Sequence, residues 1–420
     1  MKNKKITTFA FTPPISTEAG YKQYADCGFD LAIIDPSVRY GSEEYLQFFR
    51  WCDKFGMKAI PMCVNWDDGV EHGGPCEFPR TYDKTDYTQF KSFVGAYMAD
   101  EPEMKTWDKL LKNMQRFEEF YPGKFAYVNL SANYCAKELL DKFPLDSEGY
   151  GHDCARGTVD AFCDAVLNKM QGEKILSFDY YPLKIMEDGR NVLIHDWLWA
   201  YDFYSVKARD NDYTAWVFVQ TTGAKNHEYI RARELKSPAD YRFQTSIALA
   251  YGFSGIGSFC YQSFFKPYRA LIMDGEPTEG YYYVQKVNKE LHKFSPLYER
   301  FSWKCAGLNV GLDTRDYAQT CLKRMINNVT TYEKIQLEKT ESDLVIGEFV
   351  NDESKQYAYM LVNYVEPSEK KRNYITLSFK EPTTSVNIWR RGVKTERKVI
   401  DNKLKLVIST GDYAFIEIKE

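Results

Sequence analysis

Short apolar runs alternate with longer amphipathic segments through the first 300 or so residues of the chain. Eight runs have the length and composition of buried parallel strands: residues 6–11, 30–35, 58–65, 94–99, 124–130, 175–180, 215–220 and 255–261. The segments between them repeat apolar residues at spacings of three and four, as amphipathic helices do. Eight strand–helix units in succession predict an α/β fold of the (β/α)8 TIM barrel type.

Several of the expected helices have recognisable first residues. Thr17 and Ser42 each stand directly before a segment of helical periodicity, where their hydroxyls would accept from the first turn. Ser237 is followed by Pro238 at the first helical position and by Asp240 three residues on. This spacing predicts a capping box at the start of the helix before the eighth strand.

The hydrophobic pattern of the sequence changes after about residue 303. Alternating apolar and polar segments follow, separated by charged or turn-rich connections, at residues 343–350, 357–365, 374–379, 385–390, 404–408 and 413–418. They predict a small antiparallel β-sandwich. We therefore expect a barrel domain over residues 1–303 and a sandwich over residues 304–420, the latter structural or, alternatively, carbohydrate-binding.

Composition narrows the classes of partner. The 420 residues include 55 Lys and Arg against 59 Asp and Glu, a net charge of −4, so neither nucleic-acid nor membrane binding has the cationic excess it needs. Aromatic residues reach 16%, and their flat faces can stack on sugars. The first ten residues lack the apolar run of a signal peptide, which predicts a cytoplasmic location.

The ten cysteines are scattered without a C-x-x-C pair, and several lie inside apolar runs. We expect buried free thiols in a reducing compartment. The spacings closest to a metal pattern are His72 with Cys76 and His152 with Cys154, and neither pair has further ligands nearby. No metal and no cofactor are expected, and no glycine-rich phosphate loop follows an early strand.

A (β/α)8 barrel builds its active site at the carboxyl ends of its strands. The residues at or just past those ends are acids, amides and aromatics, and we predict a substrate-binding role for Asp35, Trp66, Asn129, Tyr134, Tyr180, Tyr181, Gln220 and Tyr261. At least two of the five aromatic residues in this set are expected to be exposed in a cleft, with rings free to meet a sugar. Amides and acids on the same rim would bind its hydroxyls.

The fourth strand ends in Asp100-Glu101-Pro102, the strongest chemical signal in the chain. Glu101 is expected at the barrel mouth, where the neighbouring Asp100 can raise its pKa toward the working pH of a general acid. The structural alternative is that one of these acids caps the next helix.

With this motif, residues 127–130, 177–182, 216–220 and 241–256 together resemble the clan-A (β/α)8 glycoside hydrolases, in particular the bacterial branch with Asp-Glu-Pro at the end of strand four. The resemblance covers roughly residues 6–300. It implies hydrolysis of a glycosidic bond in an oligo- or polysaccharide, with Glu101 as the acid/base. Lyase or isomerase chemistry on this fold would call for a phosphate grip, a catalytic lysine or a metal cluster that the sequence does not display.

The chain departs from this family at the end of the seventh strand, where Gln220 stands in place of the nucleophilic glutamate. A carboxamide cannot attack an anomeric carbon as a carboxylate does. Asp179, Glu228 or Glu234 could supply the second carboxylate. Alternatively, Asp100 could orient a 2-acetamido group of the substrate for attack, as in substrate-assisted N-acetylhexosaminidases, or the barrel could bind carbohydrate without cleaving it.

Overall fold

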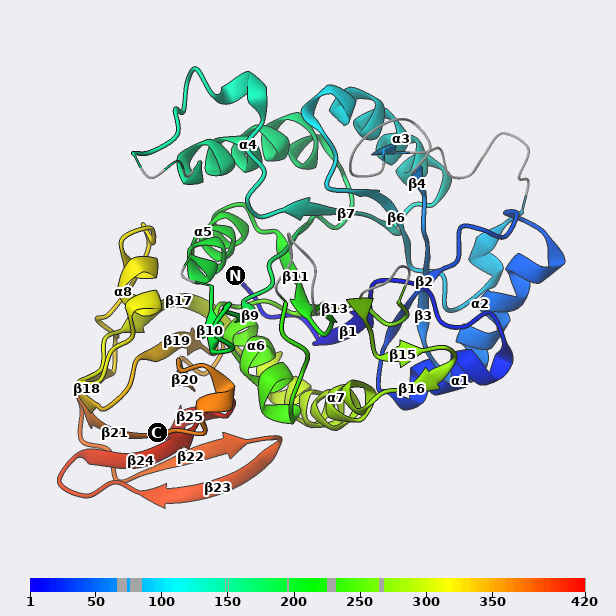
Figure 1. The fold of residues 1–420 in the computed structure, drawn as a ribbon. Helices are drawn as coiled ribbons and strands as arrows, with labels where there is room; N and C mark the ends of the chain where they lie inside the picture. The colour runs from blue at the N-terminus through cyan, green and yellow to red at the C-terminus, as the bar shows by residue number, and fades with distance from the viewer. Residues whose placement is uncertain are drawn as a thin grey trace. The chain divides into compact units, whose positions relative to one another are not determined.

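The computed structural model describes residues 1–65, 74–75, 85–147, 149, 151–194, 196–224, 232–263 and 268–419. Its longest sheet has eight strands in the order β3-β2-β1-β13-β11-β8-β7-β6 (Figure 1). The strands are β1 (Thr7–Ala10), β2 (Leu31–Ile34), β3 (Lys58–Pro61), β6 (Gly95–Asp100), β7 (Phe125–Ser131), β8 (Ile175–Asp179), β11 (Thr214–Gln220) and β13 (Gly255–Phe259). Each lies within a predicted run or within two residues of one, and the (β/α)8 barrel is confirmed.

The helices of the described chain are α1 (Glu18–Asp26), α2 (Glu43–Phe55), α3 (Trp107–Phe120), α4 (His152–Ala165), α5 (Trp197–Asp210), α6 (Pro238–Ala250), α7 (Glu279–Tyr298) and α8 (Asp316–Leu322). The predicted caps are confirmed. The side chain of Thr17 caps α1 and that of Ser42 caps α2. Ser237 and Asp240 form the capping box of α6, with Asp240 Oδ2 accepting from the Ser237 backbone at 3.0 Å.

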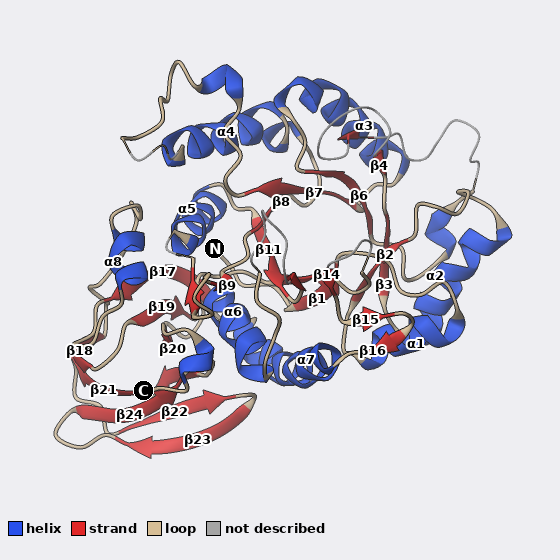
Figure 2. Ribbon diagram, in the orientation of Figure 1, coloured by secondary structure: helices blue, strands red, loops and turns tan. Residues whose placement is uncertain are grey.

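The chain divides into two compact units, here called the N-terminal unit (Thr8–Tyr180) and the C-terminal unit (Met1–Thr7 with Tyr181–Glu420). In the N-terminal unit, α1 to α4 lie outside the strands β2, β3, β6, β7 and β8 (Figure 2). Bridges Ala59–Phe93 and Met62–Tyr97 join β3 to the chain around β6. The predicted domain boundary between residues 303 and 304 stays a prediction.

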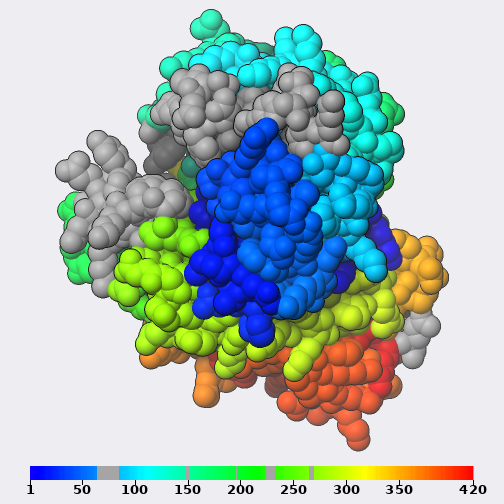
Figure 3. Space-filling model, turned by 90° about the vertical axis from the view of Figure 1, so that its right-hand side faces the viewer, coloured from blue at the N-terminus to red at the C-terminus, as the bar shows by residue number. Residues whose placement is uncertain are grey.

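The outer faces of α1 and α2 are polar, and Figure 3 shows this N-terminal segment (blue) at the surface. Lys22 pairs with Asp26 at 2.6 Å along α1, and Lys54 of α2 pairs with Glu18 of α1. These side chains are more than half exposed, so the pairs contribute at most about 1 kcal/mol each. The buried faces of the two helices carry Tyr, Phe and Cys side chains instead.

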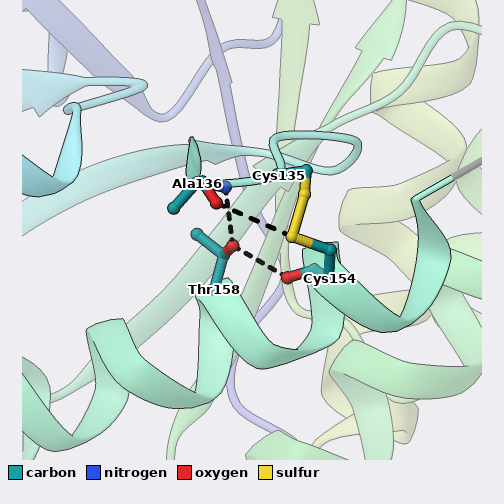
Figure 4. Close-up of a disulfide and its surroundings, with 4 residues drawn as sticks. All are labelled: Cys135, Ala136, Cys154 and Thr158. Atoms are coloured by element: carbon teal, nitrogen blue, oxygen red, sulfur yellow. Dashed lines mark hydrogen bonds between the residues drawn. A yellow bond between two sulfur atoms is a disulfide. The ribbon is translucent and has the colours of Figure 1, made fainter. Parts of the chain in front are cut away.

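The prediction that all cysteines are free thiols is wrong at one place in the N-terminal unit. Cys135 and Cys154 form a disulfide with a Cα–Cα distance of 5.2 Å (Figure 4). It joins the segment after β7 to the first turn of α4, and Thr158 supports the same contact by donating to the Cys154 carbonyl at 2.8 Å. The two cysteines are 19 residues apart, and no short cysteine motif predicts that they pair. Seven other described cysteines are free, and six of them are buried.

The carboxyl-terminal part of the C-terminal unit is an antiparallel sandwich. A six-stranded sheet has the order β17-β19-β20-β25-β22-β23, and a three-stranded sheet has the order β18-β21-β24. Their bounds are β17 (Ser302–Asn309), β18 (Ile335–Thr340), β19 (Leu344–Val350), β20 (Tyr357–Asn363), β21 (Arg372–Phe379), β22 (Ser385–Arg390), β23 (Val393–Lys398), β24 (Lys403–Ser409) and β25 (Tyr413–Ile418). Apolar side chains from both sheets form its core, with Leu361, Leu377 and Ile408 fully buried.

All six predicted sandwich segments are strands, and β17, β18 and β23 are additional. β23 has the sequence Val-Lys-Thr-Glu-Arg-Lys, and every one of its residues is exposed, so it lacks the alternation that would reveal a strand. Its pairing with β22 along the sheet edge is what makes it a strand.

Short strands complete the described structure: β4 (Val64–Asn65), β5 (Gly74–Pro75), β9 (Leu183–Ile185), β10 (Asn191–Leu193), β12 (Gly223–Ala224), β14 (Tyr268–Arg269), β15 (Ile272–Met273) and β16 (Glu276–Pro277). Among the helices given above, none combines the length and apolar content that crossing a bilayer requires.

Candidate active site

Three carboxylates gather at the carboxyl ends of neighbouring strands in the N-terminal unit. Asp100 ends β6 and Glu101 follows it, while Asp179 ends β8. β7 runs between these strands, with Asn129 beside Asp100 in the sheet register. The sheet therefore brings together three residues predicted as catalytic and one predicted to bind substrate.

Asn129 links the acids. Its Nδ2 donates to Asp179 Oδ1 at 2.9 Å and lies 3.5 Å from Asp100 Oδ1. Its Oδ1 accepts from the hydroxyl of Ser177 at 2.8 Å, which fixes the amide so that its NH2 group faces the carboxylates. The side chain is 2% exposed, so this orientation is held by its protein partners.

Two buried tyrosines support the cluster. The Tyr97 hydroxyl donates to Asp100 Oδ1 at 2.6 Å, and the Tyr127 hydroxyl lies 2.9 Å from Ser177 Oγ. Burial, with the charge of Asp100 next, holds the pKa of Tyr97 well above its usual value. Tyr97 is therefore a neutral donor to Asp100 at neutral pH.

Glu101 has a left-handed backbone conformation, with φ of 44°. A β-bulge lies just upstream, between Tyr97 and Ala99, and the Glu101 backbone N–H donates to the Asn129 carbonyl at 2.8 Å. Bulges and left-handed residues re-aim side chains at the ends of strands. Glu101 is half-buried, and the buried Pro102 turns the chain onward toward α3.

The pKa of Asp179 is raised well above its ordinary range. Burial is the largest cause, and the negative charges of Glu101 and Asp100 follow. A hydrogen bond between the Glu101 and Asp179 side chains raises this pKa further, and only the bond from Asn129 opposes the rise. Two carboxylates in such contact oppose each other's ionisation, so Asp179 keeps its proton to a higher pH than an isolated aspartate does.

No group of three or more His, Cys, Asp or Glu side chains has the geometry of a metal site in the part of the chain that the structure describes.

Gln220 ends β11 in the C-terminal unit and is 1% exposed. Its Nε2 donates to the carbonyls of Leu183 and Arg233 at 2.9 Å each and of Thr222 at 3.3 Å, and its Oε1 accepts from the Leu183 N–H at 2.9 Å. The side chain of Gln244 bonds its backbone on both sides. The carboxamide is occupied by main-chain groups, and the predicted substrate-binding role of Gln220 would require these bonds to break.

Two more predicted residues of the N-terminal unit are half-buried. Asp35 accepts from the Ser37 N–H at 2.8 Å and from Ser16 Oγ at 3.3 Å, so it closes the turn after β2. Tyr134 lies in the segment after β7, where burial and then the charge of Glu138 raise its pKa. Their roles toward a substrate stay predictions.

The remaining aromatic residues differ in exposure. Tyr180 and Tyr261 are buried, at 7% and 0% exposed, so neither contributes to the expected pair of open rings. Tyr181 is half-buried and stacks on Phe259 at 5.0 Å. Trp66 lies outside the described residues, as does Glu228, while Glu234 is half-buried, 3.5 Å from Arg269.

The supporting residues Tyr97, Tyr127 and Ser177 were not predicted from the sequence. Strand alternation could have indicated two of them. Tyr127 and Ser177 stand two residues before Asn129 and Asp179, so each lies on the same face of its strand as the site residue that follows it. The bulge in β6 shifts that register, so Tyr97 is found only from the structure.

No protein-family model matches the chain, and no curated protein matches its sequence. Similar solved structures include a catalytic mutant of a GH42 β-galactosidase from G. stearothermophilus, with 8% identity, coverage of 99% of this chain and 98% of that one, and a TM-score of 0.48. An Anoxybacillus α-amylase has 10% identity, coverage of 96% and 90%, and a TM-score of 0.48. A GH30 endoxylanase from Clostridium papyrosolvens has 7% identity, coverage of 100% and 98%, and a TM-score of 0.43. Similarity at this level assigns no reaction to the chain.

Proposed function

We propose that the protein is a glycoside hydrolase that cleaves an O-glycosyl bond in an oligo- or polysaccharide, with Glu101 as its general acid/base. The observation that carries the proposal is the cluster of Asp100, Glu101 and Asp179 at the strand ends, where burial and the neighbouring negative charges raise the pKa of Asp179. Departure of a sugar alcohol requires protonation of its oxygen, and a carboxyl group retains such a proton near neutral pH only when burial or a second acid raises its pKa.

The remaining members of the cluster have positioning roles in this proposal. Glu101 gives its proton to the glycosidic oxygen as the bond to the anomeric carbon breaks and a nucleophile, a second carboxylate or the substrate's own acetamide oxygen, bonds to that carbon. The Glu101 carboxylate later takes a proton from the water that displaces this nucleophile. Asn129 holds Asp179 beside Glu101. Tyr97 holds Asp100 in place through its hydroxyl. Each of these contacts is made within the N-terminal unit.

The partner of Glu101 in the displacement distinguishes two mechanisms. Carboxyl groups of retaining glycosidases stand about 5–5.5 Å apart, and those of inverting ones about 6.5–9.5 Å. A hydrogen bond between Glu101 and Asp179 puts these carboxyls closer than either arrangement. It favours Asp179 as the group that tunes Glu101 over Asp179 as a nucleophile.

The contact between Glu101 and Asp179 disfavours Asp179 as a nucleophile, and it thereby supports a second candidate, a substrate-assisted N-acetylhexosaminidase. In that mechanism the acetamide oxygen of the substrate attacks the anomeric carbon, and a carboxylate beside the general acid orients the acetamide N–H. Asp100 is next to Glu101 in the chain and is itself fixed by Tyr97 and Asn129. Tyr134, half-buried in the segment after β7, is the aromatic residue of this unit that we propose to lie against a sugar ring.

The test is hydrolysis of a panel of aryl glycosides that contains both hexosides and N-acetylhexosaminides. Wild type, Glu101→Gln and the control Glu103→Gln are compared; Glu103 is a neighbouring acid paired with Lys105. Cleavage that depends on Glu101 supports the proposal, and cleavage of N-acetylhexosaminides alone selects the substrate-assisted route. A protein that binds oligosaccharides and cleaves none of them is a carbohydrate-binding barrel, which contradicts it.

A further inference from the structure

A groove of about 660 Å³ lies in the C-terminal unit, beside the first turn of α6. The turn Pro367–Glu369 and the strands β21 and β24 of the sandwich form its other walls. Its lining includes three cationic side chains and four hydroxyl groups, and its residues are Asn191, Lys236, Ser237, Ala239, Asp240, Pro367, Ser368, Lys370, Arg372, Ser409 and Thr410. Nothing in the carboxylate cluster of the N-terminal unit contributes to it.

A buried ion triad lies under this groove. Arg233 donates to Asp240 Oδ1 at 2.7 Å and pairs with Glu366, and all three side chains are at most 1% exposed. Asp240 also accepts from the backbone N–H groups of Lys236 and Ser237. Asp240, which lines the groove, and Glu366, which precedes the turn at residues 367–369, are therefore already engaged by Arg233, and the N–H groups just before α6 are engaged by Asp240.

The cations that line the groove have no carboxylate partner among the described residues. Lys236 Nζ donates to the neutral amide of Asn191 at 3.2 Å, and the exposed Lys370 and Arg372 form no ion pair there. Their sequence neighbours differ: Lys371 pairs with Asp313, and Glu369 pairs with Arg315 at 2.6 Å. The positive charges of Lys236, Lys370 and Arg372 are therefore not neutralised by ion pairs, and they line the groove.

The polar groups beside these cations suit a hydroxylated ligand. Ser409 lies directly across from Arg372 in the β21–β24 ladder, and Ser368 accepts from Asn191 Nδ2 at 2.8 Å. The volume falls in the range of small-molecule sites, about 300–1,000 Å³, and exceeds the needs of a bare ion. We propose that this groove binds a saccharide that carries an anionic group, a carboxylate or a sulfate ester, independently of the reaction proposed above.

The test is calorimetric titration of the full chain with digalacturonate, galactose 6-sulfate, the dimethyl ester of digalacturonate, and sodium sulfate. The groove variant K236S/K370S/R372S is compared with the control R397S/K398S/K405S, which removes the same charge from exposed positions outside the groove. Wild type should bind at least one of the two anionic saccharides. The groove variant should bind it at least about tenfold more weakly, and the control within about twofold of wild type, because each lost charge-assisted hydrogen bond weakens binding locally.

Three outcomes would overturn the proposal. The first is that neither anionic saccharide binds, and the second is that the groove and control variants weaken binding equally. The third is that the neutral ester or sulfate alone binds as tightly as the anionic saccharides, which would make the groove a site for neutral sugars or for free anions. Because binding is measured without turnover, these results are independent of whether Glu101 proves catalytic.

Discussion

Two strand ends carry buried carboxamides with opposite surroundings. In the N-terminal unit, the NH2 group of Asn129 faces Asp179 and Asp100. In the C-terminal unit, the NH2 group of Gln220 meets three main-chain carbonyls. Asn129 thus sits among groups whose charge changes with pH, whereas Gln220 sits among groups that never titrate.

In the mechanism that we propose, the same kind of side chain supports chemistry at Asn129 and has a purely structural role at Gln220. Around Asn129, burial and the charges of Glu101 and Asp100 raise the pKa of Asp179, so the charge of this cluster depends on pH. Around Gln220 every bond of the carboxamide is satisfied, and that region has nothing to exchange with a ligand. Substitutions in the first cluster should therefore change activity, and substitutions in the second should change stability.

The largest expected effect is on turnover. Glu101→Gln should lower kcat by about 10²–10⁴ on glycosides with poor leaving groups and by less on activated aryl glycosides, because the amide cannot supply the proton. Steady-state kinetics with both kinds of substrate would measure this. Glu103→Gln, at a neighbouring acid, should stay near wild type. Full activity of the Glu101 variant on a natural glycan would remove Glu101 from the mechanism.

The converse experiment places a carboxylate at the other strand end. Gln220→Glu should not gain activity, and it should lower the free energy of unfolding by about 3 kcal/mol, because the carboxylate oxygen that replaces the NH2 group would face the carbonyls of Leu183, Thr222 and Arg233 with no hydrogen to donate to them. Denaturant unfolding is the measurement. Gln319→Glu, at an exposed site on α8, is the control. Unchanged stability would show that the contacts around Gln220 are not what holds that strand end.

Removal of the disulfide is expected to destabilise the N-terminal unit alone. The variant C135S/C154S, which lacks the disulfide, should have a free energy of unfolding about 3 kcal/mol lower than wild type, as expected when a loop of this length is released. Hydrogen exchange should quicken in residues 136–153 and stay unchanged in β11. Dithiothreitol should reproduce the effect in wild type and add nothing in the variant. Equal exchange in untreated wild type, reduced wild type and the variant would contradict the prediction.

The smallest effect concerns pH. Asp179 has a folded-state pKa above its unfolded value, so the folded protein keeps a proton that the unfolded chain releases, and stability falls as pH rises between the two values. Asp179→Asn removes this loss. Its stability should match wild type in acid and exceed it increasingly as pH rises above the ordinary aspartate range. Asp141→Asn, at an exposed aspartate, is the control, and a parallel pH profile for both variants would refute the raised pKa of Asp179.

The barrel could be predicted because its strands are buried on both faces and therefore read as continuous apolar runs. The helix caps at Thr17, Ser42 and Ser237 were equally visible, since capping depends on a few adjacent residues. β23 was not, because its strand character comes from pairing with β22.

The candidate site was predictable in position and less so in its interactions. The motif at Asp100 and Glu101 located the acids, and strand order put Asp179 near them. Their hydrogen bonds could not be foreseen, because they depend on the bulge in β6 and on which way Asn129 is turned by Ser177. The occupied state of Gln220 depends on partners far away in sequence, such as Leu183.

The left-handed backbone of Glu101 has a consequence for how this position tolerates change. A side chain at positive φ costs about 1–2 kcal/mol, which glycine would not incur, and β-branched residues fit there worst. If Glu101 is the acid/base that we propose, the backbone and the chemistry favour different amino acids at residue 101. In a deep mutational scan read out by folding, glycine and asparagine should be enriched at this codon; in one read out by catalysis, glutamate alone should survive.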